Sequence, residues 1–388
     1  MKVRNLLLAG LAAVAMTACS NENDETVDNG QVQGTENALI QLGISYPVTT
    51  RATEEEGLTS EQTFKTAKVI VNGDIHTYEY EDFRVDAFAQ EVRTVTLYAF
   101  DDNGNMVYYK TDQGEMLADG NYSMSLDFDP GEYHLIAWAG LDDQSFAVPV
   151  LYPQTSQITE LKVKTLREEA VPTRSEDEKD KYIVEKELSS LWHGEVKKGA
   201  FTRNSRERIT EVSLVKNTNN IRIVVAQVNQ HPDQPVTRAL KKENLKYTIY
   251  DENGYMNYDN SLLPDNMLTY KPFATEQEYI TSRAFTQDTD SEYPAAIAEL
   301  SVGRLMKDKK PELNITNTET GEQLIKNLDM IKYLNMLKQE HYKDMELQEY
   351  LDREDRYSMI FFVDENMALI KSVIQINGWV IQLNDFEL

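Results

Sequence analysis

Cys19 is the only cysteine in the 388-residue chain, and the residues before it indicate covalent chemistry at its sulfur. A basic start is followed by an apolar stretch, Leu6 to Met16, and then by the small residues Thr17 and Ala18. This stretch of about 11 residues is too short for a bilayer span, which takes roughly 20, so it is predicted to be an export signal. An export signal that ends on Ala-Cys is typical of a bacterial lipobox, in which the chain is cut between Ala18 and Cys19.

In a lipobox, the cysteine sulfur receives a diacylglycerol and the new terminal amine is acylated. Two or more acyl chains hold a protein stably at a membrane, because each buried CH2 contributes about 0.8 kcal/mol. We therefore predict that residues 1–18 are a lipoprotein signal peptide and that Cys19 carries the lipid, with no other cofactor. Met16 departs from the leucine that many lipoboxes carry. The alternative is an ordinary secreted protein in which Cys19 is incidental or part of a core.

Other residue types that could do chemistry are not grouped in the sequence. The histidines occur singly, and no His-Glu-x-x-His motif or further cysteine could complete a zinc site, so no metal is predicted. No nucleophile elbow, P-loop or dinucleotide fingerprint is present, and we do not expect an enzyme. Asp101 to Gly104 resembles the start of a calcium loop but lacks the later glutamate. The histidines are His76, His134, His193, His231 and His341.

Charge and cysteine content exclude further partners and cross-links. The formal net charge of −26 repels phosphate backbones, so nucleic acid is not an expected partner. With Cys19 used for lipid, no disulfide can form, and stability must come from packed cores. About 370 residues remain after the signal, which is enough for two domains.

Two β-sandwich domains are predicted to follow an acidic tether. Residues 19–36 are polar and lack periodicity, so they are expected to form a flexible tether. We assign residues 37–205 to an N-terminal β-sandwich domain and residues 206–388 to a C-terminal one. The segments "VTLYAFDDNGNMVYYK" (95–110) and "KYTIYDENGYMNYDN" (246–260) share a strand, an acidic pair, Asn-Gly and an aromatic return. This pattern predicts a hairpin in each domain and a weak internal repeat.

A third hairpin and a helix complete the predicted elements. In "NYSMSLDFDPGEYHLIAWAG" (121–140), polar and apolar residues alternate up to Asp-Pro-Gly, which predicts two strands joined by a turn. Residues 322–352 are predicted to be a helix inserted in the second domain, because leucine and isoleucine residues recur every three or four positions. The apolar parity then changes at Asn377-Gly378, which we interpret as a β-bulge.

Taken together, these segments resemble the fimbrillin-associated (minor fimbria) anchor lipoproteins of Bacteroidetes. The resemblance depends on the lipobox at Cys19, on "VTLYAFDDNGNMVYY" and "DFDPGEYHLIAWAG", and above all on "YLDREDRYSMIFFVDENMALIKSVIQINGWVIQL" (350–383). It implies a mainly β protein with two tandem transthyretin-like antiparallel β-sandwich domains. It also implies an outer-membrane lipoprotein that anchors a surface fimbria, or pilus, at its base and limits the length of the fibre.

Acidic residues follow Cys19 directly, as in the surface-export signal of Bacteroidetes lipoproteins. Ser20 also replaces the aspartate that is associated with retention at the inner membrane. The resemblance therefore implies display on the outer cell surface, although a solvated linker would have the same composition. The acidic residues are Glu22, Asp24, Glu25 and Asp28.

The resemblance also implies that fimbrial shaft subunits are the protein partners. Such subunits join by strand addition, in which main-chain hydrogen bonds give affinity and alternate side chains fill pockets. The predicted donor is the C-terminal strand region with apolar residues at Ile374, Ile376, Trp379, Ile381 and Leu383. The alternative is that this region is a permanently paired strand of the second sandwich.

Arg51 offers a rival function within fimbriae. In related polymerising subunits, cleavage after an arginine removes the lipid and the first strand and opens an acceptor groove. "SYPVTTR" before "ATEEE" has this pattern, a strand-like piece followed by arginine in a polar loop, where proteolysis concentrates. Cleavage at Arg51 would make the protein a polymerising stalk or tip fimbrillin, whereas an ordinary loop arginine leaves it an anchor.

A third function belongs to another class of protein, the glycan-binding surface lipoproteins. Exposed aromatic rings could stack on sugars, and the candidates are Tyr108, Tyr109, Tyr255 and Tyr258. The same tyrosines would equally serve as cross-strand pairs that hold a hairpin together.

Overall fold

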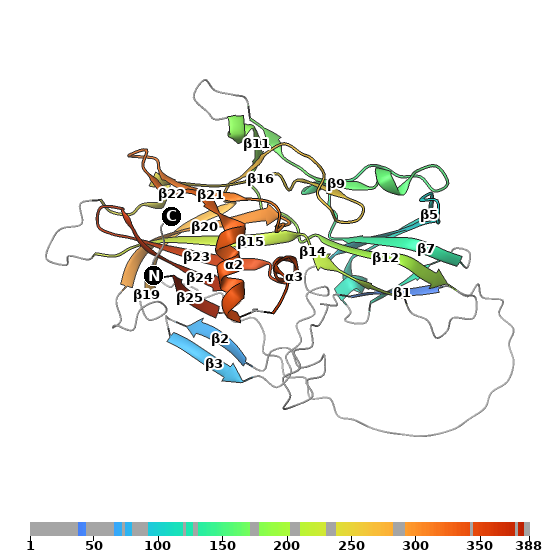
Figure 1. The fold of residues 1–388 in the computed structure, drawn as a ribbon, viewed down its shortest axis with the longest axis horizontal. Coiled ribbons are helices and arrows are strands. Elements are labelled where there is room, and N and C mark those ends of the chain that lie inside the picture. Colours follow the sequence, from blue (N-terminus) through green and yellow to red (C-terminus); the bar gives the residue numbers. More distant parts are fainter. Residues whose placement is uncertain are drawn as a thin grey trace. The chain divides into compact units, whose positions relative to one another are not determined.

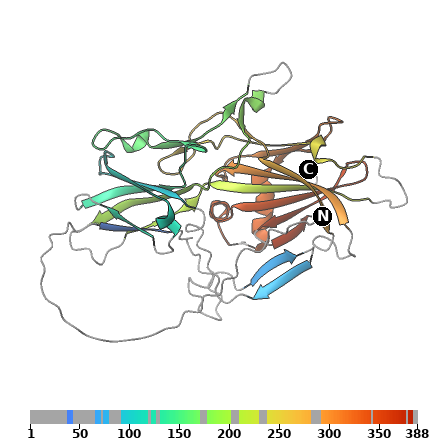
Figure 2. The same ribbon diagram turned by 180° about the vertical axis from the view of Figure 1, so that it is seen from behind.

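Strands make up most of the described chain in the computed structural model, which confirms the prediction of a mainly β protein (Figures 1 and 2). The described strands all belong to one compact unit, Asn37–Leu388. The predicted signal peptide and tether, with Ala18 and Cys19, and also Arg51, lie outside the described residues. The structure describes residues 38–43, 66–71, 74–79, 92–118, 122–126, 131–170, 178–201, 210–229, 238–281, 292–341, 344–376 and 379–383.

Two sheets made of strands between residues 38 and 216 share a core. The β4 sheet has the order β14-β12-β7-β4-β5, and the β1 sheet has the order β13-β1-β6. Leu97 and Leu135 of the β4 sheet pack with Met124 and Val212 of the β1 sheet, and all four are buried. The strands are β1 (Ala38–Gly43), β4 (Thr94–Phe100), β5 (Met106–Gln113), β6 (Ser123–Leu126), β7 (Gly131–Ala139), β12 (Trp192–Phe201), β13 (Thr210–Ser213) and β14 (Val215–Lys216).

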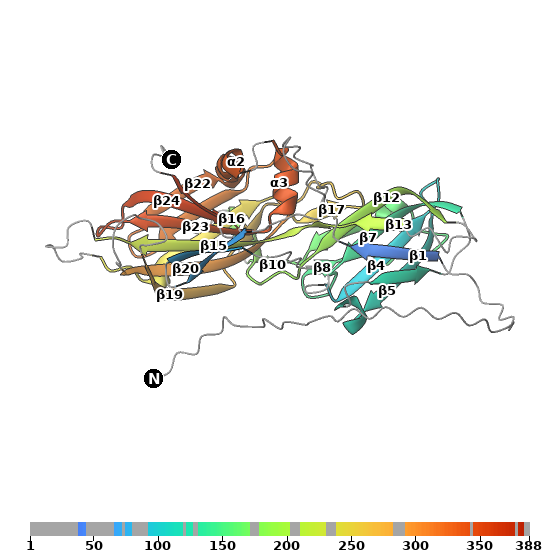
Figure 3. The same ribbon diagram turned by 90° about the horizontal axis from the view of Figure 1, so that it is seen from below.

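Two six-stranded sheets share the larger core. The β15 sheet has the order β19-β20-β15-β23-β24-β25, and Figure 3 shows the first five of these strands side by side. The β16 sheet has the order β10-β11-β18-β16-β21-β22. The first sheet comprises β15 (Thr218–Gln227), β19 (Ala274–Thr281), β20 (Glu292–Gly303), β23 (Arg356–Val363), β24 (Leu369–Ile376) and β25 (Trp379–Leu383). The second comprises β10 (Glu168–Glu169), β11 (Tyr182–Val184), β16 (Leu245–Asp251), β18 (Leu268–Tyr270), β21 (Glu312–Asn317) and β22 (Gln323–Asp329).

The remaining elements are short. Strands β8 (Phe146–Ala147), β9 (Lys162–Thr165) and β17 (Tyr255–Asn257) form the β9 sheet, and β2 (Thr66–Val71) pairs with β3 (Asp74–Glu79). The short 3-10 helices are η1 (Glu115–Ala118), η2 (Ile158–Glu160), η3 (Glu178–Lys181) and η4 (Lys242–Asn244). The α-helices are α2 (Met330–His341) and α3 (Leu347–Arg353). No helix in the described part of the chain is long and apolar enough to cross a membrane.

The predicted helix over residues 322–352 is wrong in its first part. Residues Gln323–Asp329 form strand β22, which pairs with β21, and α2 begins only at Met330. A strand is possible here because Leu324 and Leu328 are four residues apart, a spacing that places two side chains on one face of a regular strand as well as of a helix. Within α2, Tyr333 stacks on Phe361 of β23 with 6.4 Å between ring centroids, which fixes the helix against the larger core.

Of the three predicted hairpins, only that at residues 95–110 forms. Strands β4 and β5 pair directly, and Gly104 supplies the positive φ of 78° in the turn. In the segment 121–140, β6 pairs with β1 whereas β7 lies between β4 and β12, so this hairpin prediction is wrong. The alternating pattern gives β6 and β7 one apolar face each. Both faces are buried in the same core, but β6 lies in the β1 sheet and β7 in the β4 sheet.

The hairpin predicted at residues 246–260 is also wrong. Strand β16 pairs with β18 and β21, whereas β17 pairs with β9. Gly254 is needed here for space rather than for a turn, since a Cβ would lie 2.5 Å from Leu268 Cδ1 and 2.8 Å from Arg167 Nη2. The internal repeat therefore does not correspond to a repeated hairpin.

At the C-terminal end, the change of parity marks a reversal of the chain and not the predicted bulge. Strands β24 and β25 are antiparallel, and Ile376 pairs with Trp379 across the reversal. Asn-Gly between two strands is the strongest short signal for such a hairpin, and it explains the change of phase without an extra residue.

Two strand pairings link the halves of the chain. Strand β11 (Tyr182–Val184) runs parallel to β18 (Leu268–Tyr270), and β17 (Tyr255–Asn257) runs antiparallel to β9 (Lys162–Thr165). Each half thus adds strands to a sheet in the other. The domain boundary at residues 205 and 206 and the transthyretin-like topology stay predictions.

Candidate strand-addition site

Strand β1 is the central strand of the β1 sheet. Its residue Ile40 pairs with Thr210 of β13 in parallel register and with Met124 of β6 in antiparallel register. The strand therefore satisfies main-chain groups on both of its neighbours. Without β1, strands β6 and β13 would each lose a ladder of hydrogen bonds and would face each other across an empty strand position.

Strand β1 lies between the predicted lipid site and the predicted cleavage site in the sequence. The residues predicted to carry the lipid and the tether precede β1, and Arg51 follows its last residue, Gly43 (Figure 3 shows β1 beside β13). A cut after Arg51 would therefore separate β1 from the rest of the chain. The cleavage itself stays a prediction, because Arg51 lies outside the described residues.

The residues of the predicted donor strand lie in one hairpin. Ile374 and Ile376 belong to β24, while Trp379, Ile381 and Leu383 belong to β25. The register places Ile374 opposite Ile381 and Ile376 opposite Trp379. Strand β24 is paired on both sides, with β23 and β25, whereas β25 pairs only with β24 among the described strands. The C-terminal hairpin thus ends the β15 sheet, and its role as a donor stays a prediction.

The four tyrosines considered for sugar stacking do not form one platform. Tyr109 stacks on Tyr98 with 6.3 Å between ring centroids and keeps 49% of its surface exposed. Lys164 Nζ lies 5.8 Å from the centre of the Tyr255 ring, and the Tyr258 ring meets His134 edge-on. Tyr108 is next to Tyr109 in β5 and is half-buried. Tyr109 is therefore the most accessible of the four rings.

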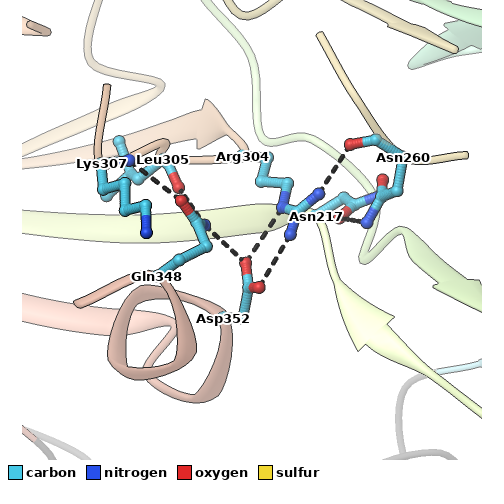
Figure 4. Close-up of polar contacts among 7 residues, drawn as sticks. All are labelled: Asn217, Asn260, Arg304, Leu305, Lys307, Gln348 and Asp352. Atoms are coloured by element: carbon cyan, nitrogen blue, oxygen red, sulfur yellow. Dashed lines mark hydrogen bonds and ion pairs between the residues drawn. The ribbon is translucent and has the colours of Figure 1, made fainter. Parts of the chain in front are cut away.

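Figure 4 shows a polar cluster that the sequence did not predict. Arg304 follows β20 and donates two hydrogen bonds to Asp352 of α3, from Nε to Oδ1 at 3.0 Å and from Nη2 to Oδ2 at 2.7 Å. Its third contact is from Nη1 to the Asn260 carbonyl at 2.6 Å. Gln348 of α3 donates to Asp352 Oδ1 and to the Leu305 carbonyl. We call Arg304, Asp352, Gln348 and Asn260 the Arg304 cluster.

The cluster continues into the link between the two halves. The side chains of Asn260 and Asn217 exchange hydrogen bonds of 2.6 and 3.1 Å, and both residues are buried. Nearby, His193 Nε2 contacts the Tyr258 carbonyl at 2.8 Å. Burial lowers the pKa of His193 to about 4, so this histidine is neutral and its Nε2 donates. The Arg304 cluster therefore has a structural role, because the charges of Arg304 and Asp352 neutralise each other and its other members are uncharged.

Asp251 has a buried carboxyl group that is only partly hydrogen-bonded. It ends β16, it is 4% exposed, and its Oδ1 accepts the backbone N–H of Glu252 at 2.8 Å. Oδ2 has no hydrogen-bond partner among the described residues. Burial raises the pKa of Asp251 to about 7, because a carboxylate loses its hydration there. The hydrogen bond from the Glu252 backbone N–H and the charge of Lys309 oppose this rise in pKa, and the charge of the Glu252 carboxylate adds to it.

Asp251 should make the stability of the protein fall as the pH rises from about 4 to above 7. The unfolded carboxyl ionises near pH 4, whereas the folded one stays protonated until about pH 7, so folding opposes ionisation over this range. We expect the wild type to lose about 2–4 kcal/mol of unfolding free energy relative to Asp251→Asn between pH 4.5 and pH 8. Urea unfolding at both pH values measures the difference, and equal changes in the two proteins would contradict it.

No group of three or more potential metal ligands occurs among the described residues. The candidate site thus consists of β1, the C-terminal hairpin and the Arg304 cluster. Among the described strands, β25 lies at an edge of the β15 sheet, and β1 lies between two neighbours.

The fold is similar to solved structures of proteins from Bacteroides. A candidate adhesin from Bacteroides thetaiotaomicron is 34% identical, with 77% of this chain and 93% of that one covered and a TM-score of 0.62. A candidate polysaccharide-binding protein from the same species is 31% identical, with 78% and 93% covered and a TM-score of 0.60. A candidate adhesin from Bacteroides ovatus is 21% identical, with 78% and 91% covered and a TM-score of 0.56.

The family model of the fimbrillin-A associated anchor proteins Mfa1 and Mfa2 matches residues 61–385. The chain belongs to this family, which confirms the family resemblance seen in the sequence. Its members are structural proteins associated with fimbriae. No curated protein matches the chain.

Proposed function

We propose that the protein is an outer-membrane lipoprotein, exposed on the cell surface, that anchors a fimbria at its base. In this proposal the lipid at Cys19 holds the chain in the membrane, and fimbrial shaft subunits join it by strand addition. Membership of the anchor family supports the association with fimbriae. The lipobox at Cys19 and the tether after it support the attachment to lipid.

The position of β1 carries the proposal. Because β1 lies between β6 and β13, the strand position between these two neighbours is filled and a neighbouring subunit could not enter it. A subunit that keeps β1 can therefore offer a strand to the fibre but cannot accept one at this site. Such a subunit ends the series of additions, which would fix the base of the fibre and limit its length.

The C-terminal hairpin is the proposed donor. It ends the β15 sheet, so β25 can leave after breaking pairs with β24 alone, whereas β24 would have to break pairs on both sides. Main-chain pairing in the acceptor groove would replace the lost hydrogen bonds, and the alternate residues Trp379, Ile381 and Leu383 would fill its pockets. Among the predicted donor residues, we therefore favour those of β25.

The processed fimbrillin is the second candidate, and the same observation makes it specific. If the chain is cut after Arg51, β1 can dissociate, and the position between β6 and β13 becomes an acceptor groove. The protein would then be a stalk or tip subunit without lipid. The two functions differ in whether the mature chain keeps β1.

A glycan-binding role is supported by the relative described as a candidate polysaccharide-binding protein and by the half-exposed ring of Tyr109. Sugar rings stack on exposed aromatic faces, but the four tyrosines do not gather in one place. A glycan array distinguishes this function, because an anchor would purify with a fibre subunit and would leave the array blank.

The intact mass and the N-terminal residue of the protein from outer membranes decide between anchor and fimbrillin. For the anchor, we expect a chain that begins at acylated Cys19. A chain that begins at Ala52 without lipid would refute the anchor and establish the processed fimbrillin. Arg51→Lys and Arg51→Ala provide the control, since each should leave an anchor beginning at acylated Cys19 and change its mass only by the difference between the side chains.

A further inference from the structure

Six apolar side chains are buried on one face of the β15 sheet, which we call the outer patch. Val224 of β15 pairs with Ile297 of β20 on one side and with Ile360 of β23 on the other, so all three side chains share a face. Each member is at most 4% exposed, and Val228 and Ile280 pack at the margin. The outer patch consists of Val224, Ala226, Ala295, Ile297, Ile360 and Phe362.

The opposite face of the same sheet already has its covering layer. Ile223, Val225 and Phe361 alternate with the residues of the outer patch, and they belong to the core shared with the β16 sheet and helix α2. The pleat of a strand directs successive side chains to opposite faces. The outer patch is therefore a separate apolar layer on the far side of the sheet from the larger core.

A second layer must cover the outer patch, because side chains on an open sheet face remain accessible to water. Every described member of this cluster lies in the β15 sheet itself or, for Val228, directly after β15. The β16 sheet and the two α-helices pack in the other core. Because the burial occurs within a single chain, the covering layer belongs to the same chain.

The β2–β3 hairpin has the properties of that layer. It is the only two-stranded sheet among the described strands and joins none of the larger sheets. A lone two-stranded hairpin is at best marginally stable in water and needs a surface to pack on. Strand β2, "TAKVIV", provides four apolar residues for such packing.

The chain between β3 and β4 gives the hairpin a long reach. About 14 residues follow Glu79 before Thr94, and an extended chain covers up to about 3.3 Å for each residue, so the link reaches about 45 Å. We propose that the β2–β3 hairpin, residues 66–79, packs on the outer patch of the β15 sheet. The N-terminal region then holds both halves of the protein, through β1 in one sheet and through the hairpin on another.

This placement is independent of the anchor function. Arg51 lies between β1 and β2, so a cut there would remove β1 and leave the hairpin attached to the chain. The apolar patch would stay covered in both the anchor and the processed fimbrillin. The hairpin would thus protect a surface that is prone to self-association in either form.

A site-specific photo-cross-linker tests the placement in the full exported chain with Cys19→Ser. We place p-benzoylphenylalanine at Ile280, on the margin of the outer patch, and identify the cross-linked peptides by mass spectrometry. We expect intramolecular cross-links to residues 66–79. Cross-links only to the neighbouring strands of the β15 sheet, to another segment or to a second copy, with none to residues 66–79, would overturn the proposal. The matched control carries the same group at Tyr279, the exposed neighbour in β19, and should give no such cross-links.

A replacement of the hairpin provides a second measurement. Residues 66–79 become a Gly-Ser segment of equal length, and the dye ANS reports exposed apolar surface. We expect a several-fold rise in ANS fluorescence while the far-ultraviolet circular dichroism of the remaining strands persists. Unchanged ANS fluorescence would show that another segment covers the outer patch and would overturn the proposal.

Discussion

Cys19→Ser should remove the protein from the outer-membrane fraction and abolish its lipid label. Without the sulfur there is no site for diacylglycerol, and the signal peptidase that requires the lipid cannot cut before residue 19. The acyl chains supply the whole membrane affinity in this account, because each buried CH2 contributes about 0.8 kcal/mol and two or more chains make attachment stable. Labelling with radioactive palmitate, followed by membrane fractionation, measures both losses.

Ser20→Ala is the matched control, since it changes the neighbouring residue and should keep both label and attachment. If Cys19→Ser remains in the carbonate-washed outer-membrane fraction, the lipid is not what holds the protein there. Under the anchor proposal, electron microscopy of cells with Cys19→Ser should also show fimbriae released into the medium. Fibres that stay attached would argue against an anchoring role while leaving lipidation intact.

Asp352→Ala should cost about 2–4 kcal/mol of unfolding free energy. Arg304 would lose both bonds of its bidentate contact, and its side chain, only 11% exposed, would keep a buried charge without the carboxylate. Gln348 would lose one acceptor as well. Urea unfolding monitored by tryptophan fluorescence measures the change at pH 6.

Glu322→Ala is the surface control for this prediction. Glu322 faces Arg238 at 3.7 Å, and both side chains are about half exposed, so its removal should change stability by about 0–1 kcal/mol. A result for Asp352→Ala within the range of the control would mean that water replaces the lost carboxylate. Asp352→Asn should retain part of the stability, because an amide oxygen can still accept from Arg304.

Local patterns predicted what depends on neighbouring residues in the chain. The hairpin at residues 95–110 formed as expected, because its Asn-Gly turn and the two flanking strands lie within one short segment. The family resemblance was also correct, because the family model matches residues 61–385. The segment 350–383, on which the resemblance chiefly depended, contains the whole of β23, β24 and β25.

Pairings between distant segments were outside the reach of those patterns. Alternation at residues 121–140 shows that β6 and β7 each have one apolar face, but it does not say which strand lies beside them. The same holds for β16 and β17, which join different sheets. The Arg304 cluster was missed because its members are far apart in sequence and each of them alone resembles an ordinary surface residue.

The exchange of strands between the halves has a mechanical meaning. Strand β11 from the first half lies in a ladder with β18, and β17 from the second half lies in a ladder with β9. A force that pulls the halves apart must break both ladders together, and each ladder resists through several parallel hydrogen bonds. Under the anchor proposal, tension from the fibre would thus be carried by both ladders at once, so the two halves would resist separation as one mechanical unit.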